Sequence, residues 1–150
     1  MVEVGCGNGA LSVAVARAGA DVVGVDLDRN AVEAAARRAE EAGLGERFHP
    51  RPGRIDKTWR RLAAAFGRFH AALVNPMRRP LGPRAMGALA RLGVERVVYV
   101  GPSPVPTARD LGALRAVDLP VQRVIPVDLY PGTYHVLTIA LGVRQPPVTP

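Results

Sequence analysis

A glycine-rich stretch near the N-terminus carries residue types that could bind a nucleotide-like ligand. It reads Glu3-Val-Gly-Cys-Gly-Asn-Gly9 and separates a β-branched run from a helical pattern. Glycines at such a junction let the backbone turn tightly and let a ligand approach without obstruction by a Cβ atom. We therefore expect cofactor-binding roles for the following residues of this stretch: Glu3, Gly5, Cys6, Gly7 and Gly9.

An acid follows at the distance that such a loop requires. Asp26 ends the run Val22-Val-Gly-Val25, and its carboxylate could accept hydrogen bonds from both ribose hydroxyls of an adenosine. The same letters also fit the dinucleotide fingerprint, Gly5-x-Gly7-x-x-Ala10 with an acid about 20 residues on, so the spacing alone does not exclude NAD. Two features favour S-adenosylmethionine (SAM) or S-adenosylhomocysteine. Glu3 offers an acid near the positive ammonium or sulfonium of that ligand, and the chain ends in an apparent antiparallel hairpin.

Short β-rich runs alternate with helical patterns along the chain, which predicts an α/β fold with a mainly parallel sheet and helices on both faces. The seven expected strands are Val2–Gly5, Asp21–Asp26, Arg47–Arg51, Ala71–Asn75, Arg96–Gly101, Val121–Val127 and Tyr134–Leu141. One expected helix begins with a capping box of Asn30 and Glu33 and ends near Gly43. The other expected helices are Leu11–Ala18, Thr58–Phe66, Arg84–Leu92 and Thr107–Arg115. The Pro131-Gly132 turn predicts antiparallel pairing of the last two strands.

The length of 150 residues predicts one domain, in which only the proline-rich tail 145–150 lacks structure. A single cysteine, Cys6, can form neither an internal disulfide nor a cysteine-rich metal site, and we expect no metal. No apolar run approaches the roughly 20 residues that span a bilayer, and no secretory leader is recognisable, so we expect a cytoplasmic protein without a membrane partner. The oligomeric state stays open.

The net charge of +7 indicates RNA as a partner, because basic side chains release counterions from phosphates. Nineteen of the twenty basic residues are arginines, however, and a genome-wide coding bias would explain that composition equally well. Part of the charge is clustered, in one group of five residues and another of three, as patches for a polyanion would be. The first cluster consists of Arg51, Arg54, Lys57, Arg60 and Arg61, and the second cluster consists of Arg78, Arg79 and Arg84.

Several stretches in combination resemble the catalytic domain of the SAM-dependent RNA uracil-C5 methyltransferase family over nearly all of the chain. Besides the glycine stretch and Val23-Gly-Val-Asp26, they are Asn75-Pro-Met-Arg-Arg79, Arg96-Val-Val-Tyr-Val100, Thr107-Ala-Arg-Asp-Leu111, Pro126-Val-Asp-Leu-Tyr-Pro131 and His135-Val-Leu-Thr-Ile-Ala-Leu141. The resemblance implies the Rossmann-like class I methyltransferase fold, a seven-stranded mostly parallel sheet with a C-terminal antiparallel hairpin. It also implies SAM as cofactor and RNA as substrate, and it adds Asn75 to the expected cofactor-binding residues.

The family reaction requires a cysteine thiolate that adds to uracil C6 and a base that later removes the C5 proton. In this resemblance the cysteine position is Pro102 and the base position is Leu137, neither of which can do that chemistry. The acid that ends the fourth strand in the family is the amide Asn75 here. We therefore expect a SAM-binding pseudoenzyme without uracil-C5 activity, and we assign no catalytic residue.

Two other functions stay open. In amine-directed methyltransferases an Asn-Pro-Pro-aromatic element accepts hydrogen bonds from the target amine, and Asn75-Pro76 could serve an active enzyme of that kind on RNA or protein. Alternatively, the chain is a non-enzymatic module that docks RNA or a protein. Family members also carry an upstream RNA-binding domain and a helical lead-in, so the chain is either a stand-alone module or a piece of a longer reading frame.

Overall fold

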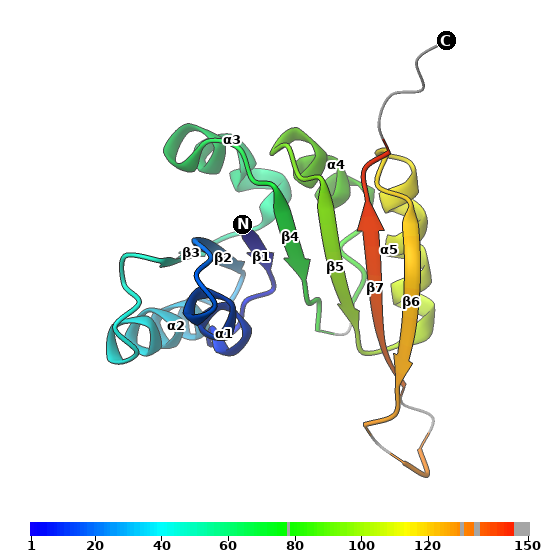
Figure 1. Ribbon diagram of the computed structural model, residues 1–150, viewed down its shortest axis with the longest axis horizontal. Coiled ribbons are helices and arrows are strands. Elements are labelled where there is room, and N and C mark those ends of the chain that lie inside the picture. The colour runs from blue at the N-terminus through cyan, green and yellow to red at the C-terminus, as the bar shows by residue number, and fades with distance from the viewer. Residues whose placement is uncertain (78, 130, 134–135, 146–150) are drawn as a thin grey trace.

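The structure, a computed structural model, describes residues 1–77, 79–129, 131–133 and 136–145. Strands and helices alternate along this part of the chain up to the last two strands, which follow each other directly (Figure 1). The strands are β1 (Val2–Val4), β2 (Val22–Asp26), β3 (Phe48–Pro52), β4 (Ala71–Val74), β5 (Arg96–Gly101), β6 (Val121–Val127) and β7 (Leu137–Val143). The helices are α1 (Ala10–Arg17), α2 (Arg29–Glu41), α3 (Ile55–Phe66), α4 (Pro83–Arg91) and α5 (Pro104–Arg115).

All the strands join one sheet in the order β3-β2-β1-β4-β5-β7-β6. The first five strands pair in parallel, whereas β7 lies antiparallel between β5 and β6. This arrangement confirms the predicted mostly parallel sheet and its antiparallel C-terminal hairpin. The order reverses between β1 and β4, and ligands of open α/β sheets bind at such a switch point, beyond the carboxyl ends of the strands.

Helices cover the two faces of the sheet unequally. In Figure 1, α1 and α2 lie over the β1–β3 half on one side, and α4 and α5 lie behind β4–β7 on the other. A large apolar core fills the space between the sheet and α3–α5, with Met86, Leu89 and Leu114 fully buried. No described helix lies in front of β5, β7 and β6, where Val98, Ile125 and Leu141 are 39%, 41% and 36% exposed.

Two helices begin earlier than their sequence pattern predicts. We expected starts at Thr58 and Thr107, but α3 begins at Ile55 and α5 at Pro104. Each threonine lies one turn inside its helix, where its hydroxyl donates to the carbonyl four residues earlier, Thr58 to Arg54 at 2.8 Å and Thr107 to Ser103 at 2.6 Å. Threonine favours helix starts because its hydroxyl bonds to nearby backbone, and here that bond is made backward along the helix.

The cap of α2 also differs from the prediction. The capping box predicts Asn30 as the N-cap, but the N-cap is Asp28, two residues earlier, and α2 begins at Arg29. The Asp28 carboxylate accepts hydrogen bonds from the backbone N–H groups of Asn30 and Ala31, at 2.9 and 3.2 Å. The two positions compete because both side chains can cap, and the chain leaving β2 presents Asp28 in extended conformation, as an N-cap requires.

The remaining boundaries shift by up to two residues, apart from the last strand. That strand was predicted to begin at Tyr134, but residues 134 and 135 lie outside the described part of the chain; β7 as described begins at Leu137 and runs two residues past Leu141. The predicted unstructured tail also falls outside it, except for Gln145. Among the residues that are described, no helix has the length and apolar character needed to span a membrane, and no three His, Cys, Asp or Glu side chains gather as metal ligands.

The cap assignment can be tested by substitution. Asp28→Ala removes the acceptor for two N–H groups and should lower the free energy of unfolding by about 1 kcal/mol, or the melting temperature by roughly 2 to 4 °C. Asn30→Ala should change either quantity by less than about a third as much, because Asn30 contributes only a backbone N–H to the cap. Urea and thermal unfolding would measure the free energy of unfolding and the melting temperature of both variants. A larger loss of stability in Asn30→Ala than in Asp28→Ala would show that Asn30 is the N-cap.

Candidate functional site

The glycine loop between β1 and α1 is shaped by its contact with the end of β4. Gly5 has a φ of 79°, and a Cβ atom there would overlap the carbonyl oxygen of Asn75. The backbone N–H of Asn75 donates to the carbonyl of Val4 at 2.9 Å, which brings the two strand ends together. Residue 5 must therefore be glycine, because this backbone leaves no room for a side chain.

Asp26 fixes the same loop from the end of β2. One oxygen of its carboxylate accepts the Gly7 N–H at 2.8 Å, and the other accepts the Asp28 N–H at 3.0 Å. A carboxylate offers about four lone-pair positions, so each oxygen can still accept another donor. The side chain is half-buried, which leaves those positions accessible to a ligand.

Glu3 is the buried acid of the site. Its side chain is 1% exposed, and its Oε2 accepts a hydrogen bond from the Ser12 hydroxyl of α1. Its Oε1 is buried without a hydrogen-bond partner among the described residues. Burial raises the pKa of Glu3 to about 7, and the neighbouring Asp26 charge adds to that rise. A buried oxygen without a donor favours a cationic or N–H-bearing ligand close by.

Cys6 behaves as a packing residue in this loop. It is 5% exposed, and a Cβ atom on the facing Gly24 would meet its sulfur at 2.9 Å. Burial, followed by the charges of Glu3 and Asp26, raises the pKa of the Cys6 thiol to about 12. The group therefore stays a neutral thiol near pH 7, and a thiol in that state is a poor nucleophile.

A cavity of about 560 Å³ opens at the carboxyl ends of β1, β2 and β4. That volume lies within the range of roughly 300 to 1,000 Å³ usual for small-molecule sites. Of the predicted residues, Gly5 and Asp26 line it, whereas Glu3, Cys6, Gly7, Gly9 and Asn75 do not. Gly7 is hydrogen-bonded to the lining residue Asp26, and Asn75 precedes the lining residues Pro76 and Met77. The Glu3 side chain instead contacts Ser12 of α1.

The opposite wall of the cavity comes from residues that the sequence analysis did not assign to this site; Arg54 was named there only as part of a basic cluster. Arg54 and Asp56 line it at the start of α3, joined by two hydrogen bonds of 3.0 Å between guanidinium and carboxylate. The Arg54 guanidinium lowers the pKa of Asp56, whose side chain is 7% exposed. Both residues follow β3, at the edge of the sheet where the parallel strands end, and that position could have indicated a place in the site. We instead expected the helix to begin only at Thr58.

The two positions that the family resemblance assigns to catalysis lie near each other at the same edge. Gly101, at the end of β5, pairs with Thr138 of β7. Pro102 directly follows Gly101, and Leu137 directly precedes Thr138. Both are half-buried. Neither side chain carries a group that can attack carbon or accept a proton.

Comparison with known proteins identifies the family. A family model described as a methyltransferase domain matches residues 1–92, so the chain belongs to the methyltransferase domain family. An uncharacterized RNA methyltransferase of Clostridium tetani is 31% identical over 143 residues, and one of Thermotoga maritima is 32% identical over 144. The chain is thus a methyltransferase domain related to RNA methyltransferases. The alignments cover 91% and 96% of this chain but 29% and 32% of the two relatives, so the chain spans less than a third of their length.

Solved structures share the fold. The tRNA (uracil-54, C5)-methyltransferase of Pyrococcus abyssi, in complex with S-adenosylhomocysteine, gives a TM-score of 0.80 at 26% identity over 95% of this chain and 33% of that chain. The magnesium protoporphyrin IX methyltransferase of Synechocystis with bound SAM gives 0.75 at 19% identity over 96% and 69%. The expected class I SAM-dependent methyltransferase fold is confirmed, and SAM is the cofactor of that fold.

The buried Glu3 predicts an unusual pH dependence of stability. Its pKa in the folded chain, about 7, lies above its ordinary value of 4.5, so the folded protein holds a proton that the unfolded chain has lost between these values. The free energy of unfolding should therefore fall as pH rises through this window, by at most on the order of 3 kcal/mol. Comparing urea unfolding at about pH 5 and about pH 8 would measure the change.

Two variants isolate the contribution of Glu3. Glu3→Gln removes the titrating group, so the loss of stability between the two pH values should shrink. Ser12→Ala removes the hydroxyl that favours the ionised carboxylate and should move the loss to higher pH. A pH profile identical in wild type and Glu3→Gln would show that Glu3 does not titrate in this window.

Proposed function

We propose that residues 1–150 act as one domain that binds SAM and descends from the RNA uracil-C5 methyltransferases, without C5-methylation activity of its own. The observation that carries the proposal is the cavity at the switch point of the sheet, which is lined by Gly5 and Asp26. The activity of the much longer relatives is not assumed for this chain, which spans less than a third of them.

The residues present fit an adenosine ligand with a cationic amino acid portion. Asp26 retains acceptor capacity for ribose hydroxyls, and the unpartnered Oε1 of Glu3 suits a nearby positive group. Gly7 and Gly9 hold the turn between β1 and α1 with φ values of 52° and 78°, and Cys6 packs beneath it. Bound SAM would supply a methyl group on a sulfonium, open to attack by a nucleophile.

The proposed lack of C5 chemistry rests on Pro102 and Leu137, at the positions of nucleophile and base. Cys6 is no substitute for the nucleophile, because its thiol stays protonated and lies under the loop. Ser103 follows Pro102, but its carbonyl receives the Thr107 hydroxyl, and no histidine or acid is hydrogen-bonded to its own hydroxyl in the described structure. A serine without a base is a weak nucleophile.

Asn75 favours a second candidate, methylation of an amine. It directly follows β4, and the next two residues line the cavity. An amide oxygen there could accept a hydrogen bond from a target amine and align its lone pair. If the chain methylates an amine, wild type should form methylated amine products on RNA or protein, and the Asn75→Ala variant should not.

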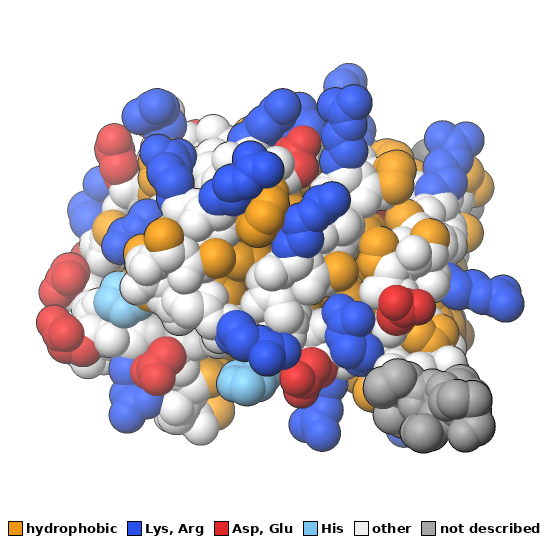
Figure 2. Space-filling view, turned by 90° about the horizontal axis from the view of Figure 1, so that it is seen from above, with side chains coloured by type: hydrophobic (Ala, Val, Ile, Leu, Met, Phe, Trp, Pro, Cys, Tyr) orange, Lys and Arg blue, Asp and Glu red, His pale blue; other side chains and the backbone are white. Residues whose placement is uncertain are grey.

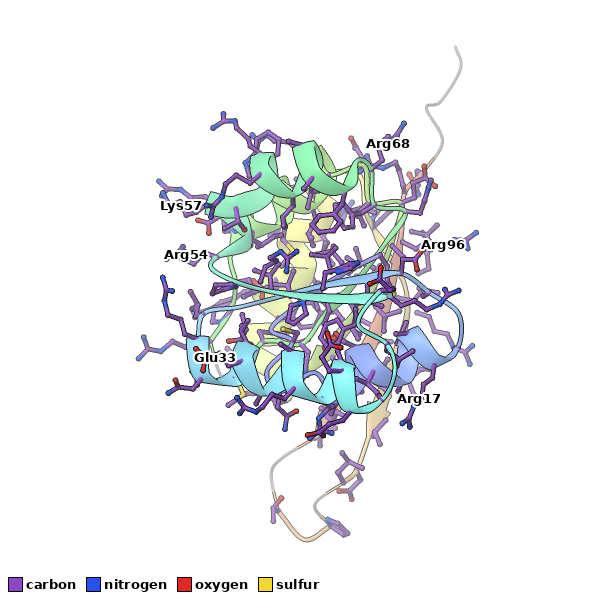
Figure 3. All side chains as sticks on the ribbon, turned by 90° about the vertical axis from the view of Figure 1, so that its left-hand side faces the viewer. Arg17, Glu33, Arg54, Lys57, Arg68 and Arg96 are labelled. Carbon is purple, nitrogen blue, oxygen red and sulfur yellow. The ribbon has the colours of Figure 1, made fainter. Side chains whose placement is uncertain are left out.

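RNA is the proposed partner because basic residues extend from the cavity rim along α3. Arg54 and Lys57 project on the same side of the molecule at the start of α3 (Figure 3), and Arg60 and Arg61 follow on that helix. The Arg60 guanidinium lies 4.9 Å from the centre of the Trp59 ring. Basic side chains outnumber acidic ones over the face in Figure 2. Arg78, in the second cluster, lies outside the described residues.

Binding of S-adenosylhomocysteine tests the cofactor proposal. A ligand at 100 times its dissociation constant adds about 2.7 kcal/mol, so the melting temperature should rise by roughly 5 to 10 °C with SAM or S-adenosylhomocysteine and stay unchanged with NAD. Asp26→Ala should weaken affinity at least about tenfold, because two ribose contacts are lost. Asp28→Ala is the matched control, since it caps α2 outside the cavity lining and should bind as wild type.

Transfer of radioactive methyl groups from SAM to uridine-containing RNA tests the activity proposal. We expect no labelling above the level of Asp26→Ala, because thiolate and base are missing at positions 102 and 137. Labelled 5-methyluridine formed by wild type and absent in Asp26→Ala would refute the proposed loss of activity. An absence of ligand binding would instead refute the cofactor proposal and leave a docking module.

A further inference from the structure

The buried carboxylate of Asp110, on α5, is hydrogen-bonded to the backbone of the segment that forms one wall of the cavity. Asp110 is 0% exposed and accepts three hydrogen bonds. Its Oδ2 receives the Leu81 N–H at 2.8 Å and the Tyr99 hydroxyl at 2.6 Å, and its Oδ1 receives the Gly82 N–H at 2.8 Å. These contacts join segments that are 11 to 29 residues apart along the chain.

The segment that Asp110 holds belongs to the candidate site. Pro80 and Leu81 line the cavity, and Gly82 is the N-cap of α4. Gly82 has a φ of 80° and no side chain to cap the helix. The Asp110 carboxylate accepts the N–H of this N-cap residue, as the acid of a capping box does. The positive end of the α4 dipole also favours a carboxylate here.

Neighbouring groups reinforce the hydrogen bonds of the Asp110 carboxylate. Burial, reinforced by Asp110, raises the pKa of the Tyr99 phenol, which therefore always donates. A Cβ atom on Gly101 would overlap Thr107 of α5, so α5 lies directly against the end of β5. Asp110 thus joins the loop after β4 to the strand and helix that frame the loop after β5.

We propose that Asp110 is a positioning residue of the candidate site, which fixes the Pro80–Gly82 wall of the cavity and so sets the affinity for its ligand without touching it. The affinity part of this inference rests on the proposed SAM binding, whereas the fixed wall does not. Asparagine in place of Asp110 would keep the shape but turn an N–H₂ group toward one of the three donors.

The experiment compares Asp110→Asn with Tyr99→Phe as matched control. Both remove a hydrogen bond of the same buried network, but Tyr99→Phe leaves both N–H groups of the wall bonded to Asp110. Amide hydrogen exchange of Leu81 and Gly82 and calorimetric binding of S-adenosylhomocysteine are measured where all proteins are folded. Asp110→Asn should speed exchange at least about tenfold and weaken binding about five- to tenfold, and Tyr99→Phe should change each by less than about twofold.

A purely structural role predicts a different result. Equal effects of the two variants, or an unchanged exchange rate in Asp110→Asn, would overturn the proposal. If Asp110→Asn does not fold, the double variant Asp110→Leu with Tyr99→Phe replaces the network by apolar contacts and should show the same fast exchange. Failure of wild type to bind S-adenosylhomocysteine would refute the proposed function, while the exchange data would still decide whether Asp110 fixes the wall.

Discussion

The contact between the ends of β1 and β4 is the constraint on which the site depends. The Asn75 carbonyl occupies the space of a side chain at position 5, and the Asn75 N–H is bonded to Val4. Because the two loops meet there, the backbone after Gly5 must turn toward β2, where Asp26 receives the Gly7 N–H. The cavity exists because the loops diverge beyond this contact, as happens wherever strand order reverses in a parallel sheet.

Charge is divided between the interior and the surface of this basic chain. Glu3 and Asp110 are buried without a cationic partner among the described residues, and both depend on hydroxyl or backbone N–H donors. The arginines are mostly exposed and project into solvent (Figure 2). Backbone donors are fixed by the fold, whereas an arginine side chain is mobile, so the buried acids define geometry and the surface charge defines the approach of a ligand.

The sequence predicted the parts of the fold that local chemistry determines. The β-branched runs and the helical patterns located strands and helices to within a few residues. The structure shows why: Val32, Ala35 and Ala39 form the buried face of α2, and Pro83 is the first residue of α4. Helix starts at Thr58 and Thr107 were wrong because the same hydroxyl can bond inside a helix. The glycine loop and Asp26 were recognisable from spacing, but the Arg54–Asp56 wall and the Asp110 contact depend on segments that only the folded sheet brings together.

The placement of Cys6 has a practical consequence for spectroscopy. Alkylating reagents react with thiolates, and the only native sulfhydryl of the chain is both enclosed and protonated. A cysteine introduced on the surface can therefore carry a fluorophore or spin label selectively while Cys6 stays unmodified. Pairs of such labels would measure distances across the cavity in solution, in a chain whose glycine loop keeps its native sequence.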